Sequence, residues 1–357
     1  MEQKGYDMST ASFGELNYKN HTNISHLRRQ INPIQDVLAL LQLLALIIRL
    51  KPQIVHTHTP KAGLLGMCAA WVCQVPLRMH TVAGLPLMEK KGFLFKLLVA
   101  MEQLTYFFST SVHPNSKGLL DFIHKSISKN SKITIIGKGT SNGINLNHFN
   151  PTSVSEEEQL QCISRHNLKD KLVYIFVGRM VRDKGVVETV NAFVKINKGK
   201  PETALVLVGP FEPELDPIPS DILKEIDSHA CIHAVGYQED VRPYITVSDI
   251  LVFPSYREGF PNVPLQCGAF KKALILSDIN GCDEIVQNNE TGILVQPKDA
   301  DALYLAMEKL AMDEGIRAEY GSAAYEFIQE NFQQEEVWKA IDSEYNKQIS
   351  LLDTSDV

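Results

Sequence analysis

Short runs of consecutive apolar residues recur along the chain and alternate with longer stretches of mixed character. Most of the runs are apolar without interruption, a pattern typical of strands buried on both faces of a parallel sheet. Their alternation with helical stretches predicts βαβ units and an α/β fold. The predicted strands are residues 53–58, 77–83, 110–114, 132–137, 172–178, 204–209, 232–237, 249–255, 273–278 and 292–297.

A polar segment, residues 150–161, interrupts this alternation. NPTSVSEEEQLQ combines proline, serine and glutamate without an apolar period, which is typical of a linker. A chain of 357 residues is long enough for two domains. We predict two doubly wound α/β domains, residues 1–150 and 151–335, and a helical segment 336–357 that returns to the first domain. Ligands of such sheets bind beyond the carboxyl ends of the strands, and a cleft between domains is the expected site.

The longest apolar stretch, residues 37–50, has 14 residues and contains Gln42 and Arg49. A membrane-crossing helix needs about 20 apolar residues. We therefore expect a helix buried in the protein core and no transmembrane segment. The residues that follow Met1 are too polar for a signal peptide.

Charge is distributed unevenly. Residues 1–150 contain 16 Lys+Arg and 7 Asp+Glu, a net charge of +9, and the remaining residues contain 19 and 35, a net charge of −16. A basic half suits anionic lipid or phosphate, although chance unevenness is the alternative. Residues 85–108 mix three lysines with Phe and Leu, which fits either an anionic membrane surface or an ordinary amphipathic core helix. We expect no nucleic-acid partner. Six cysteines without C-x-x-C spacing argue against a zinc site or disulfides, and for a reducing cytosol.

Two segments of the second half combine residue types suited to an anionic ligand. Arg179 and Lys184 follow the strand that ends at Gly178, and such cations beyond a strand end suit a diphosphate, with a solvated charged turn as the alternative. In FPSYREGFPNVPLQ, residues 253–266, Asn262 is predicted to cap a helix whose first turn has no Asp or Glu. The amino terminus of that helix would offer its N–H groups to an anion, with Glu258 beside it.

These segments, together with others along the chain, resemble motifs of a known enzyme family. GRMVRDKG, SDILVFPSYREGFPNVPLQCGAF and TGILVQPKD resemble the donor-binding half of the family-4 glycosyltransferases. KPQIVHTHTPKAGLLG, HTVAGLP, PNSKG and GKGTSNGIN resemble members that extend lipid-linked sugars in bacterial surface-polysaccharide assembly. The likeness covers about residues 5–335. It implies a GT-B fold, two Rossmann-like domains that face each other across a cleft, with the acceptor on the N-terminal one.

The resemblance also implies a reaction. A nucleotide-sugar, with UDP-sugars favoured over GDP-sugars, would donate its sugar with retention to a polyprenyl-diphosphate-linked saccharide, without a metal or other cofactor. The enzyme would be cytoplasmic and peripheral to the anionic inner face of the cell membrane. Without a metal, cations and amides must neutralise the leaving diphosphate.

Carried over residue by residue, the resemblance assigns catalytic roles to Glu258, Arg179 and Lys184. Glu258 would contact the transferred sugar, Gln266 the ribose, and Val235–Tyr237 would lie near the base. Thr57, Lys61 and His80 are expected on the acceptor side. The donor-binding residues would be Gly178, Gly209, Gly236, Tyr237, Gly259, Phe260, Pro261, Asn262 and Gln266.

The sequence departs from the family pattern at three places. Gln266 stands where the family usually has a second glutamate. Ala83 stands where it often has a histidine; His80 could compensate, but we favour a core histidine. KGYDMSTAS matches the family's second strand, so we expect the first strand and its glycine loop to be missing. A nucleotide-sugar epimerase of the same fold is one alternative function, and an inactive nucleotide-sugar-binding remnant, which the late start would leave, is the other. A metal pair at His56 and His58 is not expected, because no third ligand lies nearby.

Overall fold

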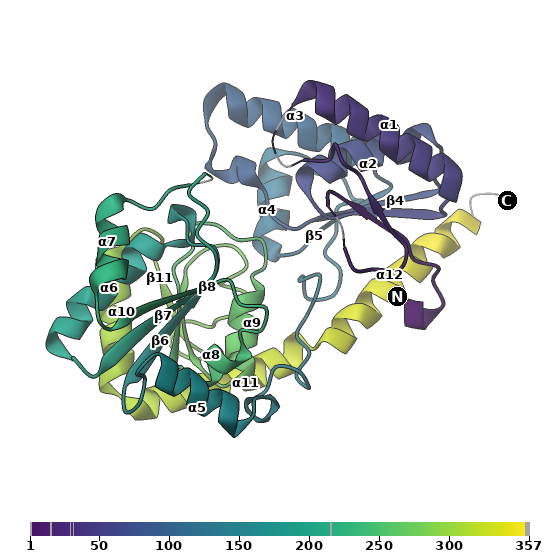
Figure 1. Ribbon diagram of the computed structural model, residues 1–357. Helices are drawn as coiled ribbons and strands as arrows, with labels where there is room; N and C mark the ends of the chain where they lie inside the picture. Colours follow the sequence, from purple (N-terminus) through teal and green to yellow (C-terminus); the bar gives the residue numbers. More distant parts are fainter. Residues whose placement is uncertain (1, 15, 29, 31, 215, 354–357) are drawn as a thin grey trace. The chain divides into compact units, whose positions relative to one another are not determined.

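The computed structural model describes residues 2–14, 16–28, 30, 32–214 and 216–353 (Figure 1). The chain forms two compact units: unit 1 comprises residues 1–141 and 336–357, and unit 2 comprises residues 142–335. The division lies at residue 141 rather than at 150. Residues 142–150 belong to unit 2 because Ile144 exchanges backbone hydrogen bonds with Phe332 and Gln334 at 2.8 and 3.0 Å.

Unit 2 is built on one parallel sheet of six strands in the order β11-β10-β9-β6-β7-β8. Every one of these strands lies within or next to a predicted apolar run. The order reverses between β6 and β9, and the carboxyl ends of strands at such a reversal are where ligands bind. The strands are β6 (Leu172–Val177), β7 (Thr203–Val208), β8 (Ile232–Gly236), β9 (Ile250–Phe253), β10 (Ala273–Ser277) and β11 (Ile293–Val295).

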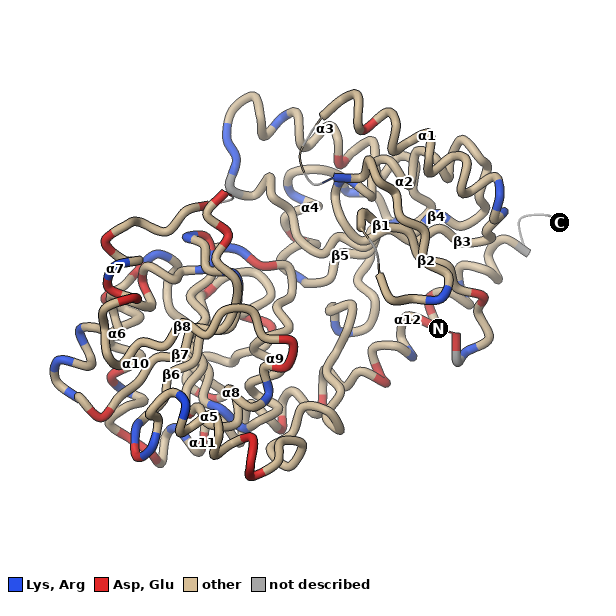
Figure 2. Tube along the Cα trace, viewed as in Figure 1, with Lys and Arg blue, Asp and Glu red and all other residues tan. Residues whose placement is uncertain are grey.

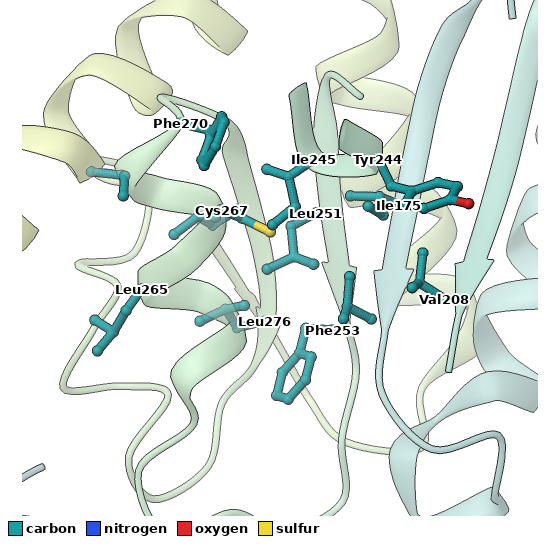
Figure 3. Close-up of a cluster of buried hydrophobic side chains, with 14 of the residues drawn as sticks. Ile175, Val208, Tyr244, Ile245, Leu251, Phe253, Leu265, Cys267, Phe270 and Leu276 are labelled. Carbon is teal, nitrogen blue, oxygen red and sulfur yellow. The ribbon is translucent and has the colours of Figure 1, made fainter. Parts of the chain in front are cut away.

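Helices cover both faces of this sheet, as a doubly wound fold requires. Consecutive strand residues point to opposite faces, so Ile175 packs in one buried cluster (Figure 3) and its neighbours Tyr174 and Phe176 pack in the other. Burial of each such side chain contributes about 1.5–3 kcal/mol. The helices are η3 (Pro151–Ser153), α5 (Glu156–Arg165), η4 (Arg182–Lys184), α6 (Val186–Gly199), α7 (Ser220–Ser228), α8 (Arg242–Thr246), α9 (Asn262–Ala269), α10 (Ala300–Met312) and α11 (Glu314–Asn331).

The linker predicted at residues 150–161 was wrong over its second half, because α5 begins at Glu156 and continues to Arg165. Ser155 and Glu158 form a capping box: the serine side chain accepts the N–H of Glu158, and the glutamate accepts the N–H of Ser155. These two bonds satisfy donors that a helix start leaves unpaired, and Cys162 anchors the helix in the core. The spacing of serine and glutamate was a stronger signal than the polar composition.

Unit 1 contains a parallel three-stranded sheet, β3-β4-β5, and a separate parallel pair, β1-β2. Helix α2 packs on β3 and β4, and it contacts both α1 and α3. The strands are β1 (Thr10–Ser12), β2 (His21–Asn23), β3 (Ile54–Thr57), β4 (Leu77–Val82) and β5 (Ser111–Pro114). The helices are η1 (Glu2–Lys4), α1 (Pro33–Leu50), α2 (Pro60–Val72), η2 (Pro86–Glu89), α3 (Gly92–Phe108), α4 (Lys117–Ser126) and α12 (Gln334–Asp353), which joins unit 1 from Glu336.

The strand predicted at residues 132–137 is not formed. Ile133 makes a single isolated bridge to Val112, with backbone hydrogen bonds of 3.0 Å on either side of it. The chain then leaves the sheet edge for a turn at Gly137, whose φ is +57°. An apolar run alone did not distinguish a strand from this single bridge.

Helix α1 forms where a helix was predicted, but it is not buried in the protein core as predicted. Asn32 caps it by accepting the N–H of Gln35, and only Ala39, Leu43, Leu46 and Ile47 are buried. The opposite face is open, so burial applies to one face only. By length and composition alone α1 could cross a membrane, and 17% of its apolar window is buried in the structure. The large apolar side chains exposed on α1 are Ile34, Val37, Leu38, Leu41, Ile48 and Leu50.

Candidate active site

Two loops of unit 2 meet beside the point where the strand order reverses. One loop follows β6 and the other follows β9. Asp183 joins them: its carbonyl accepts the N–H of Tyr256 at 2.9 Å, and its carboxylate pairs with Arg257 at 2.9 Å. Gly185 has φ +75°, and a Cβ there would overlap the carbonyl oxygen of Pro254. Glycine at this position therefore lets α6 begin directly against the second loop.

Lys184 and Glu258, both predicted to be catalytic, are in direct contact. The Lys184 Nζ lies 2.5 Å from the Glu258 Oε1, although the residues are 74 positions apart in sequence. Both side chains are largely buried, with exposed fractions of 18% and 13%. A buried charge without a partner is strongly destabilising, and this contact gives each of the two charges its partner.

Arg179, the third predicted catalytic residue, has a different partner. Its guanidinium pairs with Glu212 at 2.9 Å, and the two side chains are 30% and 33% exposed. Glu212 belongs to the loop after β7, which runs beside the loop after β6. The N–H of Met180 donates to the carbonyl of Pro210, and the N–H of Asp183 donates to the Asp216 carboxylate.

Three predicted donor-binding glycines stand at neighbouring strand ends. Gly178 donates its N–H to Val208 at 2.9 Å, and Gly209 donates to Gly236 at 2.8 Å. Gly209 has φ +143°, and a Cβ there would overlap the carbonyl of Gly178. Tyr237 follows Gly236 and is 73% exposed, so its ring is available for stacking. The strand ends form a glycine-lined edge with one aromatic face beside it.

The loop after β10 contacts the backbone around Glu258 and holds it in place. Asn280 donates from its side-chain amide to the carbonyls of Glu258 and Gly259, at 2.9 and 3.1 Å. Gly281 has φ +79°, and a Cβ there would overlap the carbonyl oxygen of Gly259. The two loops are therefore packed backbone to backbone.

The remaining predicted donor-binding residues lie just before α9 or within it. Phe260 is 8% exposed and packs edge to face on Phe332 at 5.2 Å, so its side chain belongs to the core. The prediction that Asn262 caps α9 was wrong: Pro261 is the capping position, and Asn262 is the first helical residue. The first turn contains no acidic residue, as predicted. Gln266 lies one turn further along and is half-buried.

The predicted acceptor-side residues are engaged within unit 1. The Thr57 hydroxyl and the His80 Nδ1 are 2.8 Å apart, and both side chains are buried. Burial lowers the pKa of His80 to about 3, and Gly63 of α2 packs directly on its imidazole. His80 is therefore a neutral core histidine, the interpretation favoured above. Lys61 pairs with Asp36 at 2.6 Å.

Unit 1 has a cavity of about 220 Å³ at the carboxyl ends of β3, β4 and β5. His56 fixes one wall of it, because its ring nitrogens lie 2.6 Å from the Tyr345 hydroxyl and 2.7 Å from that of Thr81. Burial, with the neighbouring histidines, holds the pKa of His56 well below its usual range. The described residues include no group of three or more His, Cys, Asp or Glu side chains placed to hold a metal ion. Other residues at the cavity include His58, His113, Asn115, Thr140 and Trp338.

Three residues of the unit 2 site were not among the predicted ones: Asp183, Glu212 and Asn280. Asp183 lies in RDKG, between Arg182 and Lys184, and only the positively charged residues of this loop were considered as ligands for a diphosphate. The Asn280–Gly281 pair after a buried strand is a recognisable turn signal. Nothing local to Glu212 identifies it, since its role depends on how two loops lie side by side.

Comparison with known proteins identifies the family. The description "Glycosyl transferases group 1" matches residues 159–327, and "Glycosyl transferase 4-like domain" matches residues 22–139. The capsular polysaccharide biosynthesis glycosyltransferase CapM of Staphylococcus aureus is 32% identical over 352 residues, which cover 97% of this chain and 91% of that protein. The chain belongs to the group 1 glycosyltransferases.

One further relative and two solved structures are similar to the chain. The N,N'-diacetylbacillosaminyl-diphospho-undecaprenol alpha-1,3-N-acetylgalactosaminyltransferase of Campylobacter jejuni is 27% identical over 295 residues, 81% of this chain and 76% of that protein. Anabaena HepE in complex with UDP superposes with a TM-score of 0.74 at 15% identity, over 87% and 82% of the two chains. WaaG, a glycosyltransferase involved in lipopolysaccharide biosynthesis, gives 0.74 at 13% identity, over 96% and 92%. The predicted family, transferase activity and α/β GT-B fold class are confirmed.

Proposed function

We propose that this glycosyltransferase moves a sugar from a UDP-sugar, bound by unit 2, to a saccharide carried on a polyprenyl diphosphate, bound by unit 1. The observation that carries the proposal is the contact between Lys184 and Glu258, with Arg179 on the same loop as Lys184, where the strand order reverses. Relatives support it: the S. aureus protein is named for capsular polysaccharide, the C. jejuni protein for an undecaprenol diphosphate, and HepE was solved with UDP.

In this proposal the donor diphosphate is held by cations and amides. An ammonium has three N–H donors; one of those on Lys184 is directed to Glu258, which leaves two for phosphate oxygens. The guanidinium of Arg179 adds a second cation. The N–H groups at the start of α9, where the first turn has no acidic residue, would donate to the same charge. Tyr237 stacks on the base and Gln266 binds the ribose.

The chemical step then needs no protein base. An acceptor hydroxyl oxygen forms a bond to the anomeric carbon while the bond from that carbon to the diphosphate oxygen breaks. The electron pair leaves with UDP, and the acceptor proton passes to the departing phosphate oxygen on the same face, so the configuration is retained. Glu258 stabilises the positive charge that develops on the sugar. Arg179, Lys184 and the α9 amides neutralise the leaving group, and no metal ion is required.

We also propose that helix α3 rests on an anionic membrane surface, where a lipid-linked acceptor is found. Phe93 and Phe107 of α3 are 80% and 66% exposed. Lys90, Lys91 and Lys96 surround its start and are exposed, and Figure 2 shows these basic positions in blue. Each lysine near an anionic surface contributes about 1 kcal/mol to binding, and the apolar side chains add to it.

Vesicle sedimentation tests the membrane assignment. The protein should sediment with vesicles that contain phosphatidylglycerol and much less with pure phosphatidylcholine. Phe93→Ser should weaken this binding, whereas Phe211→Ser, which removes a 41% exposed phenylalanine from unit 2, should not. Equal loss with both variants, or equal binding to both lipids, would contradict the assignment.

The transfer reaction tests the function. Purified protein in EDTA is given UDP-glucose, UDP-galactose, UDP-N-acetylglucosamine or UDP-N-acetylgalactosamine, with synthetic undecaprenyl-diphosphate-linked N-acetylglucosamine or N-acetylgalactosamine, and products are weighed by mass spectrometry. One combination of donor and acceptor should give an acceptor that is longer by one sugar. Glu258→Ala should abolish transfer but keep UDP binding. Near-wild-type transfer by that variant would refute its assigned role, and epimerisation of a UDP-sugar without acceptor would favour an epimerase.

A further inference from the structure

We infer that Asn280 is a positioning residue for the transferred sugar, acting through the backbone of Glu258 and Gly259; the inference rests on the proposed function. Its side-chain amide donates to both consecutive carbonyls, at 2.9 and 3.1 Å. An amide nitrogen carries two hydrogens, so one side chain serves both acceptors. A carbonyl pair that converges on one donor fixes the peptide between them.

This fixation matters because the segment from Tyr256 to Phe260 is neither helix nor strand. Without a hydrogen-bond ladder, its conformation depends on single contacts: the bond from the Tyr256 N–H to the Asp183 carbonyl at one end, and the side chains that reach the rest. Gly281, next to Asn280, lets the loop after β10 approach until its backbone touches that of Gly259. Strands β9 and β10 are hydrogen-bonded neighbours, so both loops start from one rigid edge. Asn280 transmits that rigidity to the Glu258 loop.

Two contacts fix the position of the Glu258 carboxylate. Lys184 holds its side chain, and Asn280 holds its main chain. Removal of Asn280 would leave the lysine contact and the Arg179 loop in place. UDP binding should therefore persist, and the placement of Glu258 against the sugar should suffer. A group displaced by about 1 Å can cost a reaction about a hundredfold in rate.

The test compares two variants. Asn280→Ala removes the donor and its volume, whereas Asn280→Asp keeps the volume but presents a carboxylate that cannot donate to a carbonyl. We expect kcat for transfer to fall by about ten- to a hundredfold in both, with the aspartate variant at least as impaired. The dissociation constant for UDP, measured by calorimetry, should stay within about threefold of wild type.

Two controls separate positioning from general damage. Asn288→Ala removes another side chain that bonds the backbone, here the N–H of Leu294 at 3.0 Å, away from Glu258, and should transfer normally. Thermal unfolding should confirm that all variants are folded. Near-wild-type transfer by Asn280→Asp with loss in Asn280→Ala would indicate a packing role and overturn the inference. Normal transfer by both variants would also overturn it, and the proposed function would stand. A wild-type protein that binds no UDP would overturn the proposed function and the inference together.

Discussion

Glu212→Gln is expected to strengthen UDP binding. The Arg179 guanidinium, which we assign to the donor diphosphate, is already paired with the Glu212 carboxylate. One of the five guanidinium N–H donors is directed to Glu212, so donors remain for the diphosphate, but the carboxylate offsets part of the positive charge that the diphosphate would meet. This offset reduces the affinity for UDP. Glutamine has nearly the same shape but lacks the charge, so the affinity should rise.

The size of the effect follows from the exposure of the pair. The two atoms are 2.9 Å apart, and the side chains are 30% and 33% exposed. Pairs with this access to water contribute about 0.5–1 kcal/mol. Since each 1.4 kcal/mol is about tenfold in affinity, the dissociation constant for UDP should fall about two- to fivefold. The gain should shrink at about 1 M salt, where charges are screened beyond about 3 Å.

Calorimetric titration of UDP into wild type, Glu212→Gln and Glu214→Gln measures this. Glu214 is exposed in the same loop and makes no hydrogen bond or ion pair among the described residues. Its substitution removes the same charge without touching Arg179, and should change affinity less than about twofold. Unchanged or weaker UDP binding by Glu212→Gln would refute the view that Glu212 offsets the positive charge that the diphosphate meets at Arg179.

Three further outcomes are expected. Burial raises the pKa of Glu102 from 4.5 to about 7, so its proton stabilises the fold below pH 4.5 and the contribution is lost as pH rises through 7. Urea unfolding between pH 5 and 8 should show wild type losing roughly 2–3 kcal/mol more than Glu102→Gln, and parallel profiles would contradict this. Gly209→Ala should lower the melting temperature and UDP affinity together, whereas Gly199→Ala, where a Cβ meets nothing within 4 Å, should do neither. A double-mutant cycle of Lys184→Met and Glu258→Gln should give a coupling energy of about 1–3 kcal/mol in unfolding, and strict additivity would contradict their pairing.

Much of the fold could be predicted because parallel strands covered on both faces leave continuous apolar runs in the sequence. The family resemblance assigned Lys184 and Glu258 to one donor site, and the strand ends they follow share one edge of the sheet, but their direct contact was not predicted. The failures were local. Residues 132–137 have strand composition but only one bridge. Residues 150–161 have the composition of a linker, although the Ser155–Glu158 capping box marks the start of a helix within them.

Two properties could not be read from the sequence in principle. Apolar content predicted helix α1 but not which of its faces the core covers, because that depends on the packing of α2. The contacts of Glu212 and Asn280 depend on two pairs of loops, those after β6 and β7 and those after β9 and β10, that approach within hydrogen-bond distance although they are far apart in sequence. Such contacts follow from the strand order, which local patterns do not determine.

The central claim, a UDP-sugar site at the strand ends of unit 2, is tested most directly by thermal unfolding in excess EDTA with and without UDP. At about 100 times its dissociation constant, UDP should stabilise the protein by about 2.7 kcal/mol. For a unit of this size the melting temperature should rise by roughly 5–10 °C, and Arg179→Ala should reduce the rise. No shift of the wild-type protein with UDP or with any UDP-sugar would contradict the account.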